Sequence, residues 1–262
     1  MRKLLIEYVN AKSNEVDLQF DPRLYPPLPY DPCSKDPRVQ RKVAHYLLLV
    51  ASLDEGNIVG EAGNARKLLV GCYSILKEEL FTSDEDAFRE ACARLDMVFS
   101  TRKSRLIPSI LGSVNSFVSN QARGDLVGYS KQFDRPFELA EQISRNIFQM
   151  GRTEGSSRKK TWVYLRWMVR SPPDLRVFDH MRPSDLFVPL DKNVARVAVC
   201  LNILPVERLG SLTWDDTVKV TEFARQLFPE DPARVDYPFF LLGRKLRGSS
   251  TLFENALISA MT

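Results

Sequence analysis

Helical spacing of apolar residues recurs along the whole chain, whereas strict alternation of apolar and polar residues is almost absent. In the segment that opens with Asp36 and Pro37, the side chains of Val43, Leu47 and Val50 are spaced to line one face of a helix. Asp36 followed by Pro37 is typical of an N-cap and a first helical residue. Because no period of two supports strands, the sequence predicts an all-α fold.

The expected helices cover most of the 262 residues. Besides a helix from residue 36 to about 53, we expect helices at about residues 2–9, 64–81, 83–98, 107–120, 136–150, 214–227, 233–246 and 251–261, and helices that begin near residues 158 and 191. A proline-rich segment at 20–37 is expected to lie across the surface as a strap. The hydrophobic content of 44% is ample for one large domain or two small lobes.

Composition narrows the class of protein only modestly. A net charge of +4 permits nucleic-acid binding without requiring it. The four cysteines, Cys33, Cys72, Cys92 and Cys200, are too scattered for a zinc or iron–sulfur site. Neither a signal peptide nor an apolar run of membrane length is evident. We therefore expect a soluble intracellular protein with reduced thiols, no metal, no cofactor and no membrane partner.

The segment GSSRKKTWVYLRWMVR, residues 155–170, places three cations where a helix is expected to begin. Unpaired backbone N–H groups and the positive end of the helix dipole lie at that end, so Arg158, Lys159 and Lys160 oppose the local charge preference. An anion such as a phosphate that docks at the helix start would explain them. So would a lysine whose pKa is lowered by its neighbours, which frees the amine as a nucleophile. A solvated surface patch is the simpler alternative.

Asp191 is the second residue that the sequence singles out. It follows the apolar residues 187–190 and precedes Val194, Val197 and Leu201, which share one helix face, so it is expected to be an N-cap. Backbone amides and the helix dipole hold such a carboxylate in place and keep it ionised. A cap with no further role is the default alternative.

Three strings carry a resemblance to a known superfamily: residues 155–170, FVPLDKNVARVA at 187–198 and DPARVDYPFFLLGRK at 231–245. They resemble the helix-hairpin-helix DNA glycosylases. More closely, they resemble the archaeal 8-oxoguanine DNA glycosylases and a bacterial family known only as a domain of unknown function. The resemblance covers about residues 155–244, with a weaker echo at Asp36 and Pro37.

The resemblance implies one helical domain, residues 1–262, made of two lobes with the active site in the cleft between them. The hairpin and catalytic lysine would lie at about residues 150–170, before the helix capped by Asp191. The implied activity is that of a bifunctional DNA glycosylase and AP lyase of base excision repair, which removes a damaged purine, 8-oxoguanine first, through a lysine Schiff base. DNA would be the partner, with no cofactor and no obligatory protein partner, in the cytoplasm at the nucleoid.

The superfamily pattern assigns roles to the residues around the expected hairpin. Lys159 falls on the nucleophile, because with Lys160 in that role the charged Arg166 would take a position where the family buries an aliphatic side chain. Lys160 stays the alternative nucleophile and is otherwise a phosphate contact. The phosphate contacts of the hairpin would be Gly155, Ser156, Ser157 and Arg158, although this sequence lacks the usual glycine pair there.

The resemblance also implies a pocket for the extruded base. Asp236 and Phe240 are four positions apart and share a helix face. They fall where an aspartate of the archaeal enzymes hydrogen-bonds the purine and an aromatic ring stacks on it. Arg38 stands near a position where the archaeal pattern has a base-contacting amide, whose acceptor a guanidinium lacks. The alternative is that Phe240 is a core residue and Asp236 a helix cap.

Two other functions remain open from the sequence. One is a glycosylase-like fold that binds nucleic acid without chemistry. The other is a helical hydrolase or metal-dependent nuclease that uses the acidic residues 84–86, for which His45 and His180 are the only imidazoles. That acidic run, Asp84, Glu85 and Asp86, is typical of the first turn of a helix, where the dipole favours negative charge.

Overall fold

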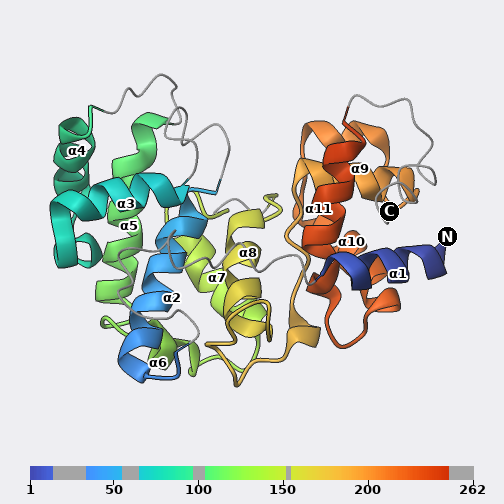
Figure 1. Cartoon of the computed structure of the whole chain (residues 1–262), viewed down its shortest axis with the longest axis horizontal. Coiled ribbons are helices and arrows are strands. Elements are labelled where there is room, and N and C mark those ends of the chain that lie inside the picture. Colours follow the sequence, from blue (N-terminus) through green and yellow to red (C-terminus); the bar gives the residue numbers. More distant parts are fainter. Residues whose placement is uncertain (14–33, 55–64, 97–103, 152–154, 248–262) are drawn as a thin grey trace.

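The computed structural model describes residues 1–13, 34–54, 65–96, 104–151 and 155–247. Every regular element in these ranges is a helix, so the predicted all-α class is confirmed. Figure 1 shows the helices gathered into two groups that lie side by side along the longest axis of the molecule. In the described part of the chain, none of the helices has both the length and the apolar character to cross a membrane.

The first lobe contains the helices from α2 to α8, which surround the larger hydrophobic core. Its elements are α2 (Pro37–Ser52), α3 (Ala65–Leu76), α4 (Glu85–Arg94), α5 (Ile107–Asn120), α6 (Leu126–Ser130), α7 (Pro136–Asn146) and α8 (Lys159–Val169). The central helix of this lobe is α2, which contacts α3, α5, α6 and α8. Its residues Leu47, Leu48 and Leu49 are fully buried, so the second half of this helix is enclosed on nearly every side.

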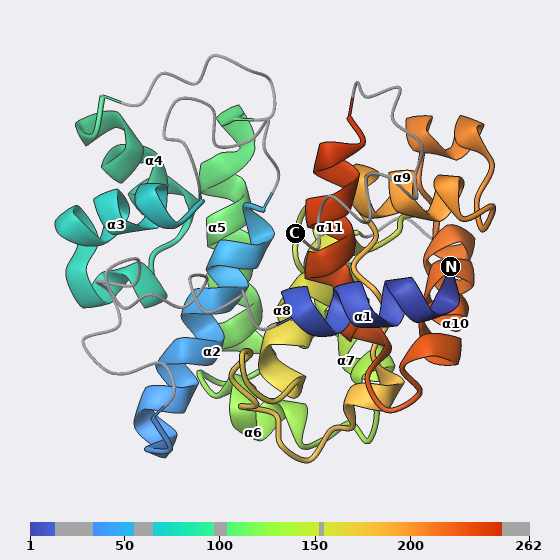
Figure 2. The same ribbon diagram turned by 45° about the vertical axis from the view of Figure 1, so that its right-hand side comes forward.

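The second lobe is built from the N-terminal and C-terminal parts of the described chain, which pack around a separate hydrophobic core. Its elements are α1 (Arg2–Lys12), α9 (Lys192–Cys200), α10 (Trp214–Leu227) and α11 (Asp236–Lys245). Figures 1 and 2 both show α1 packed beside α11. The buried hydroxyl of Tyr8 donates a hydrogen bond of 3.0 Å to the carbonyl oxygen of Pro238, which ties the first helix to the last.

The closest packing in the second lobe is between α9 and α11. A Cβ atom added at Gly243 would lie 2.0 Å from the backbone oxygen of Asn193. Only glycine permits this approach, because any side chain would collide with backbone that cannot move aside. The contact holds the start of α9, and therefore Asp191, in a fixed place against α11.

Most predicted helices are confirmed, with differences at their ends. The helix expected at 83–98 begins at Glu85, because Asp84 caps it through the amide of Ala87 at 3.0 Å. The hydroxyl of Ser83 bonds instead to the oxygen of Glu79 in the preceding turn. The helix expected at 64–81 ends at Leu76, and a short 3-10 turn at Lys77–Phe81 follows. The helix expected to reach residue 150 ends at Asn146.

Two predicted elements lie wholly or partly outside the residues that the structure describes. The helix at 251–261 and residues 20–33 of the strap lie outside the described residues. The last residues of the strap, Asp36 and Pro37, form the predicted start of α2. There the carboxylate of Asp36 accepts a hydrogen bond from the amide of Arg38 at 2.8 Å.

Candidate active site

The helix that carries the candidate nucleophile begins as predicted. Its first residue is Lys159, and Arg158 is the N-cap, in a left-handed conformation with φ of 53°. No side chain caps this end of α8. The orphan donors and the positive dipole therefore coincide with the cation run, which we define as Arg158, Lys159 and Lys160.

Each member of the cation run has an internal partner. Arg158 pairs with Glu141 of α7, and its guanidinium lies 5.4 Å from the ring centroid of Trp214. The side-chain nitrogen of Lys159 lies 2.9 Å from a carboxylate oxygen of Asp54. That of Lys160 donates to the backbone oxygen of Ser52, also at 2.9 Å. The protein itself therefore stabilises the run, and no docked anion is needed to explain it.

The end of α2 explains why two lysines are tolerated at the start of α8. Backbone carbonyls without helical partners and the negative end of the dipole gather at the C-terminus of a helix. Lys160 bonds to the oxygen of Ser52, and Lys159 donates to the backbone oxygen of Asp54 at 3.3 Å as well as to its carboxylate. The positive end of α8 is thus docked on the negative end of α2.

The predicted lowering of the lysine pKa is wrong. Burial lowers the pKa of Lys159, but the carboxylates of Asp54, Asp191 and Asp236 outweigh it and hold the pKa above its ordinary value. The neighbouring cations do not have the expected effect, because carboxylates from other elements lie close to this amine. Lys159 is therefore an ammonium in the resting protein at neutral pH.

The placement of Lys160 does not support its predicted role as a phosphate contact. Its side chain is buried, and its ammonium bonds to Ser52 inside the first lobe. A phosphate contact would require this ammonium to leave Ser52, so the role stays a prediction. Lys159 is more exposed, with 29% of its side chain accessible. Of the two lysines, Lys159 has the better access for chemistry on a bound substrate.

Asp191 caps α9 as predicted. One carboxylate oxygen accepts from the backbone amides of Asn193 and Val194, both at 2.8 Å. The carboxylate also acts on the pKa values of Lys159 and Asp236, and it raises both. Asp191 is therefore a fixed anion of the second lobe that faces a lysine of the first.

The capping role and the charge of Asp191 are separable by mutation. We expect Asp191→Ala to lower the free energy of unfolding by about 1 kcal/mol, because two amides lose their acceptor. Asp191→Asn keeps an acceptor at the cap, so we expect a change within about 0.5 kcal/mol. Urea unfolding of the three proteins measures the difference. Equal losses in both variants would contradict the capping explanation.

Asp236 is buried at the start of α11 and does not cap that helix. One of its carboxylate oxygens lies 2.5 Å from a guanidinium nitrogen of Arg166, on α8 of the first lobe. Arg166 is itself buried and paired with carboxylates, so a buried position on α8 does hold a charged residue. The choice of Lys159 over Lys160 depends instead on the carboxylates around Lys159.

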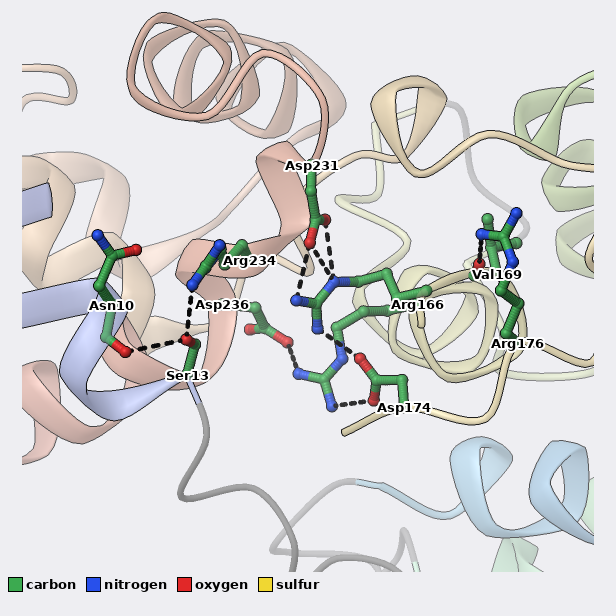
Figure 3. Close-up of polar contacts among 10 residues, drawn as sticks. Asn10, Ser13, Arg166, Val169, Asp174, Arg176, Asp231, Arg234 and Asp236 are labelled. Carbon is green, nitrogen blue, oxygen red and sulfur yellow. Dashed lines mark hydrogen bonds and ion pairs between the residues drawn. The ribbon is translucent and has the colours of Figure 1, made fainter. Parts of the chain in front are cut away.

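Five charged residues, all buried except the partly exposed Asp231, form a network between the lobes: Arg166, Arg170, Asp174, Asp231 and Asp236. Figure 3 shows Arg166 between the carboxylates of Asp174 and Asp236. Arg166 also lies 3.6 Å from Asp174, and Arg170 pairs with both Asp174 and Asp231, the latter at 2.8 Å. Arg166 is on α8 and Arg170 directly follows the last residue of that helix, whereas Asp231 and Asp236 belong to the second lobe. We call these residues the interlobe network.

Burial raises the pKa of Asp236 to about 6, against the opposing attraction of Arg166. Since the folded value exceeds the ordinary one, this carboxyl stabilises the fold fully below about pH 4, and its contribution is lost as the pH rises through about 6. In the wild type the free energy of unfolding should fall by at most ~1.4 kcal/mol per pH unit across that window, and we expect Asp236→Asn to remove this fall. Urea unfolding of both proteins at pH 4 to 7 measures it; parallel pH profiles would contradict it.

The remaining predicted base contacts are less well placed. The ring of Phe240 is partly buried and stacks on that of Tyr237, with centroids 6.4 Å apart. Arg38 is exposed at the start of α2 and pairs with Asp36. Helical rise puts it about 20 Å along the axis from Ser52, at the far end of α2. Arg38 is therefore not grouped with Lys159, and its base contact stays a prediction.

The described part of the hairpin lies against the second lobe. Ser157 donates to the oxygen of Leu190 at 3.4 Å, and its own backbone oxygen accepts from Thr217 at 3.3 Å. The hydroxyl of Ser156 accepts from the amide of Arg158 at 3.2 Å. Gly155 is exposed, and residues 152–154 lie outside the described ranges. The guanidinium of Arg158 is bound to Glu141, and its predicted phosphate role stays a prediction.

The residues considered for a metal site have other roles. Asp84 caps α4, and Glu85 pairs with Arg89 one turn later. His45 lies 2.8 Å from Asn115, and His180 contacts the backbone oxygen of Ser130. Within the ranges that the structure covers, no three histidine, cysteine or acidic residues are grouped to hold a metal ion.

Asp54 is the site residue that sequence reasoning missed. It follows α2 in a loop segment, 105 positions before its partner Lys159. No local pattern marks it, because a helix C-terminus needs no acidic residue and its dipole disfavours one. Only the packing of α2 against α8 brings the two together.

The fold and the site together define an all-α, two-lobed protein. Lys159 of one lobe is under the electrostatic influence of two carboxylates of the other, the N-cap Asp191 and the buried Asp236. Residues 82–245 match the family described as "Protein of unknown function (DUF2400)". The match spans more than half of the chain and includes Lys159, Asp191 and Asp236, so the chain belongs to this family. No curated protein and no solved structure matches it.

Proposed function

We propose that this protein is a bifunctional DNA glycosylase and AP lyase whose nucleophile is Lys159. One observation carries the proposal: the partly exposed amine at the start of α8 lies within electrostatic range of the N-cap carboxylate of Asp191. An amine nucleophile beside a fixed anion suits a reaction in which positive charge develops on a sugar. The predicted superfamily resemblance assigns the same two residues to those roles.

The reaction would begin when one nucleotide is taken out of the stack. The neutral amine of Lys159 attacks the anomeric carbon as the glycosidic bond breaks, and the base leaves with the bonding electron pair. The anion of Asp191 stabilises the cationic sugar in the transition state. Loss of the amine proton and opening of the sugar ring give a Schiff base, and β-elimination of the 3′ phosphate then nicks the strand.

The proposed substrate is a damaged purine, with 8-oxoguanine as the first candidate. Ring N–H and exocyclic amine groups of a purine are donors for a carboxylate. Asp236 is such an acceptor, held in place by Arg166 and close enough to Lys159 to affect its pKa. DNA is then the partner, and neither a cofactor nor a second protein takes part in the proposed chemistry.

A lesion panel with borohydride trapping tests the proposal. Duplexes that carry 8-oxoguanine, an oxidised pyrimidine, uracil or an abasic site are incubated with the protein and borohydride. We expect a covalent protein–DNA adduct with at least the abasic and 8-oxoguanine duplexes, because borohydride reduces a Schiff base to a stable amine. No adduct with any duplex would refute the catalytic proposal.

A second candidate is a nucleic-acid-binding protein without catalysis. The ion pair between Lys159 and Asp54 and the raised lysine pKa favour it, because an ammonium has no lone pair for attack. It predicts duplex affinity that falls steeply with salt and survives both Lys159→Gln and Asp191→Asn. Binding titrations at two salt concentrations, run beside the trapping assay, separate the candidates.

A further inference from the structure

The partner of the candidate nucleophile is the feature that the proposed function leaves unexplained. Lys159 donates to the carboxylate of Asp54 at 2.9 Å and to the backbone oxygen of the same residue at 3.3 Å. The ammonium therefore points at the C-terminal end of α2. An amine that uses two of its protons in this way is held away from any substrate.

The surroundings make this pair more than a solvated surface contact. The adjacent Lys160 is fixed to Ser52, two residues before Asp54, so α2 and α8 are joined at two successive positions. Only 29% of the Lys159 side chain is exposed, against 45% for Asp54. The carboxylate is thus the more water-accessible member, and the lysine stem is the more enclosed one.

We propose that Asp54 is a positioning residue that holds Lys159 in a resting state and must release it before the amine reacts. This inference rests on the proposed function. Release breaks two hydrogen bonds from the ammonium; its proton passes to a water molecule or buffer base, and the nitrogen lone pair then forms the bond to the anomeric carbon. Asp54 is therefore a brake on the nucleophile rather than its base.

The charged groups around Lys159 determine whether removal of the Asp54 charge raises or lowers the pKa of the lysine. Asp54 faces it from the end of α2, Asp191 from the start of α9 and Asp236 from α11; Lys160 is the next residue along α8. Asp54 is the strongest of the three carboxylate influences that keep the pKa of Lys159 high, while burial opposes them. Without its charge, more of the amine is neutral at any pH below the pKa.

Competitive acetylation with acetic anhydride measures that neutral fraction directly, because only an unprotonated amine reacts. Labelling of the Lys159 peptide is followed by mass spectrometry from pH 6 to 9. We expect Asp54→Asn to raise the labelling of Lys159 at pH 7 about ten-fold, which corresponds to a pKa lower by about one unit. The conservative Asp54→Glu keeps the charge and should label as the wild type does.

A matched control removes another lysine's carboxylate. Lys42 lies 2.7 Å from Glu78, and Lys42 is on α2 well before its C-terminus. Glu78→Gln should leave the labelling of Lys159 unchanged. Unchanged labelling of Lys159 in Asp54→Asn would overturn the inference, whatever the activity of the protein.

Trapping on an abasic duplex completes the test. At pH 6 to 7 we expect adduct formation by Asp54→Asn to be several-fold faster than by the wild type, with the difference shrinking toward pH 9. Slower trapping despite stronger labelling would show that Asp54 acts as a base and would overturn the inference. Stronger labelling with no adduct in either protein would support the brake and refute the proposed function, so the two failures are distinguishable.

Discussion

Replacement of Lys159 by glutamine is expected to abolish the borohydride-trapped adduct and to slow strand nicking at least ~10³-fold, because the attacking amine is lost and the neighbouring Lys160 is buried. Glutamine retains a hydrogen-bond donor for Asp54, which is half exposed and can be solvated. The fold should therefore survive, and duplex binding should change little. Gel analysis of adducts beside a thermal unfolding curve measures both.

The matched control for this experiment is Lys160→Gln. Lys160 is buried against Ser52, so its loss should lower stability and leave adduct formation by the folded protein intact. If instead Lys160→Gln removes the adduct and Lys159→Gln retains it, Lys160 is the nucleophile and the carboxylates around Lys159 serve another purpose.

Replacement of Arg166 by methionine is expected to lower the free energy of unfolding by about 3–5 kcal/mol, since it leaves Asp174 and Asp236 buried with less compensating charge. Methionine fills most of the volume, so the loss reports on charge rather than on a cavity. Urea unfolding measures it. Because Arg166 joins the two lobes, the variant should also unfold with less cooperativity.

Arg182→Met is the control for the buried arginine. Arg182 pairs with Asp185 at 3.0 Å, but 72% of its side chain is exposed. An exposed pair of this kind contributes about 0–1 kcal/mol. Similar losses in both variants would mean that the interlobe network contributes no more than a surface ion pair.

Local features of the fold could be predicted from the sequence. The N-cap of α9 was predictable because an aspartate before a helical apolar face satisfies amides of its own first turn. The start of α2 was predictable for the same reason, from Asp36 and Pro37. Both signals depend only on residues within one helical turn.

The electrostatics of the site could not be predicted from local sequence. The cation run looked unpaired because its partners, Glu141, Asp54 and the oxygen of Ser52, come from other helices. The wrong prediction that the pKa of Lys159 is lowered has the same cause, because the carboxylates that raise this pKa also come from other elements. The sequence indicates which charged side chains need a partner of opposite charge. Only the packing of the helices shows which residues are those partners.

The separation of the two hydrophobic cores has a consequence for catalysis and its control. Lys159 and Asp54 are carried by the first core, whereas the contact of Gly243 with Asn193 fixes Asp191 and α11 on the second. A small rotation of one lobe would therefore change the gap between the Lys159 amine and the Asp191 carboxylate, and it would also have to shift the interlobe network. Since a misplacement of about 1 Å can cost a hundred-fold in rate, the relative position of the two lobes would, under the proposed function, set the rate of the reaction.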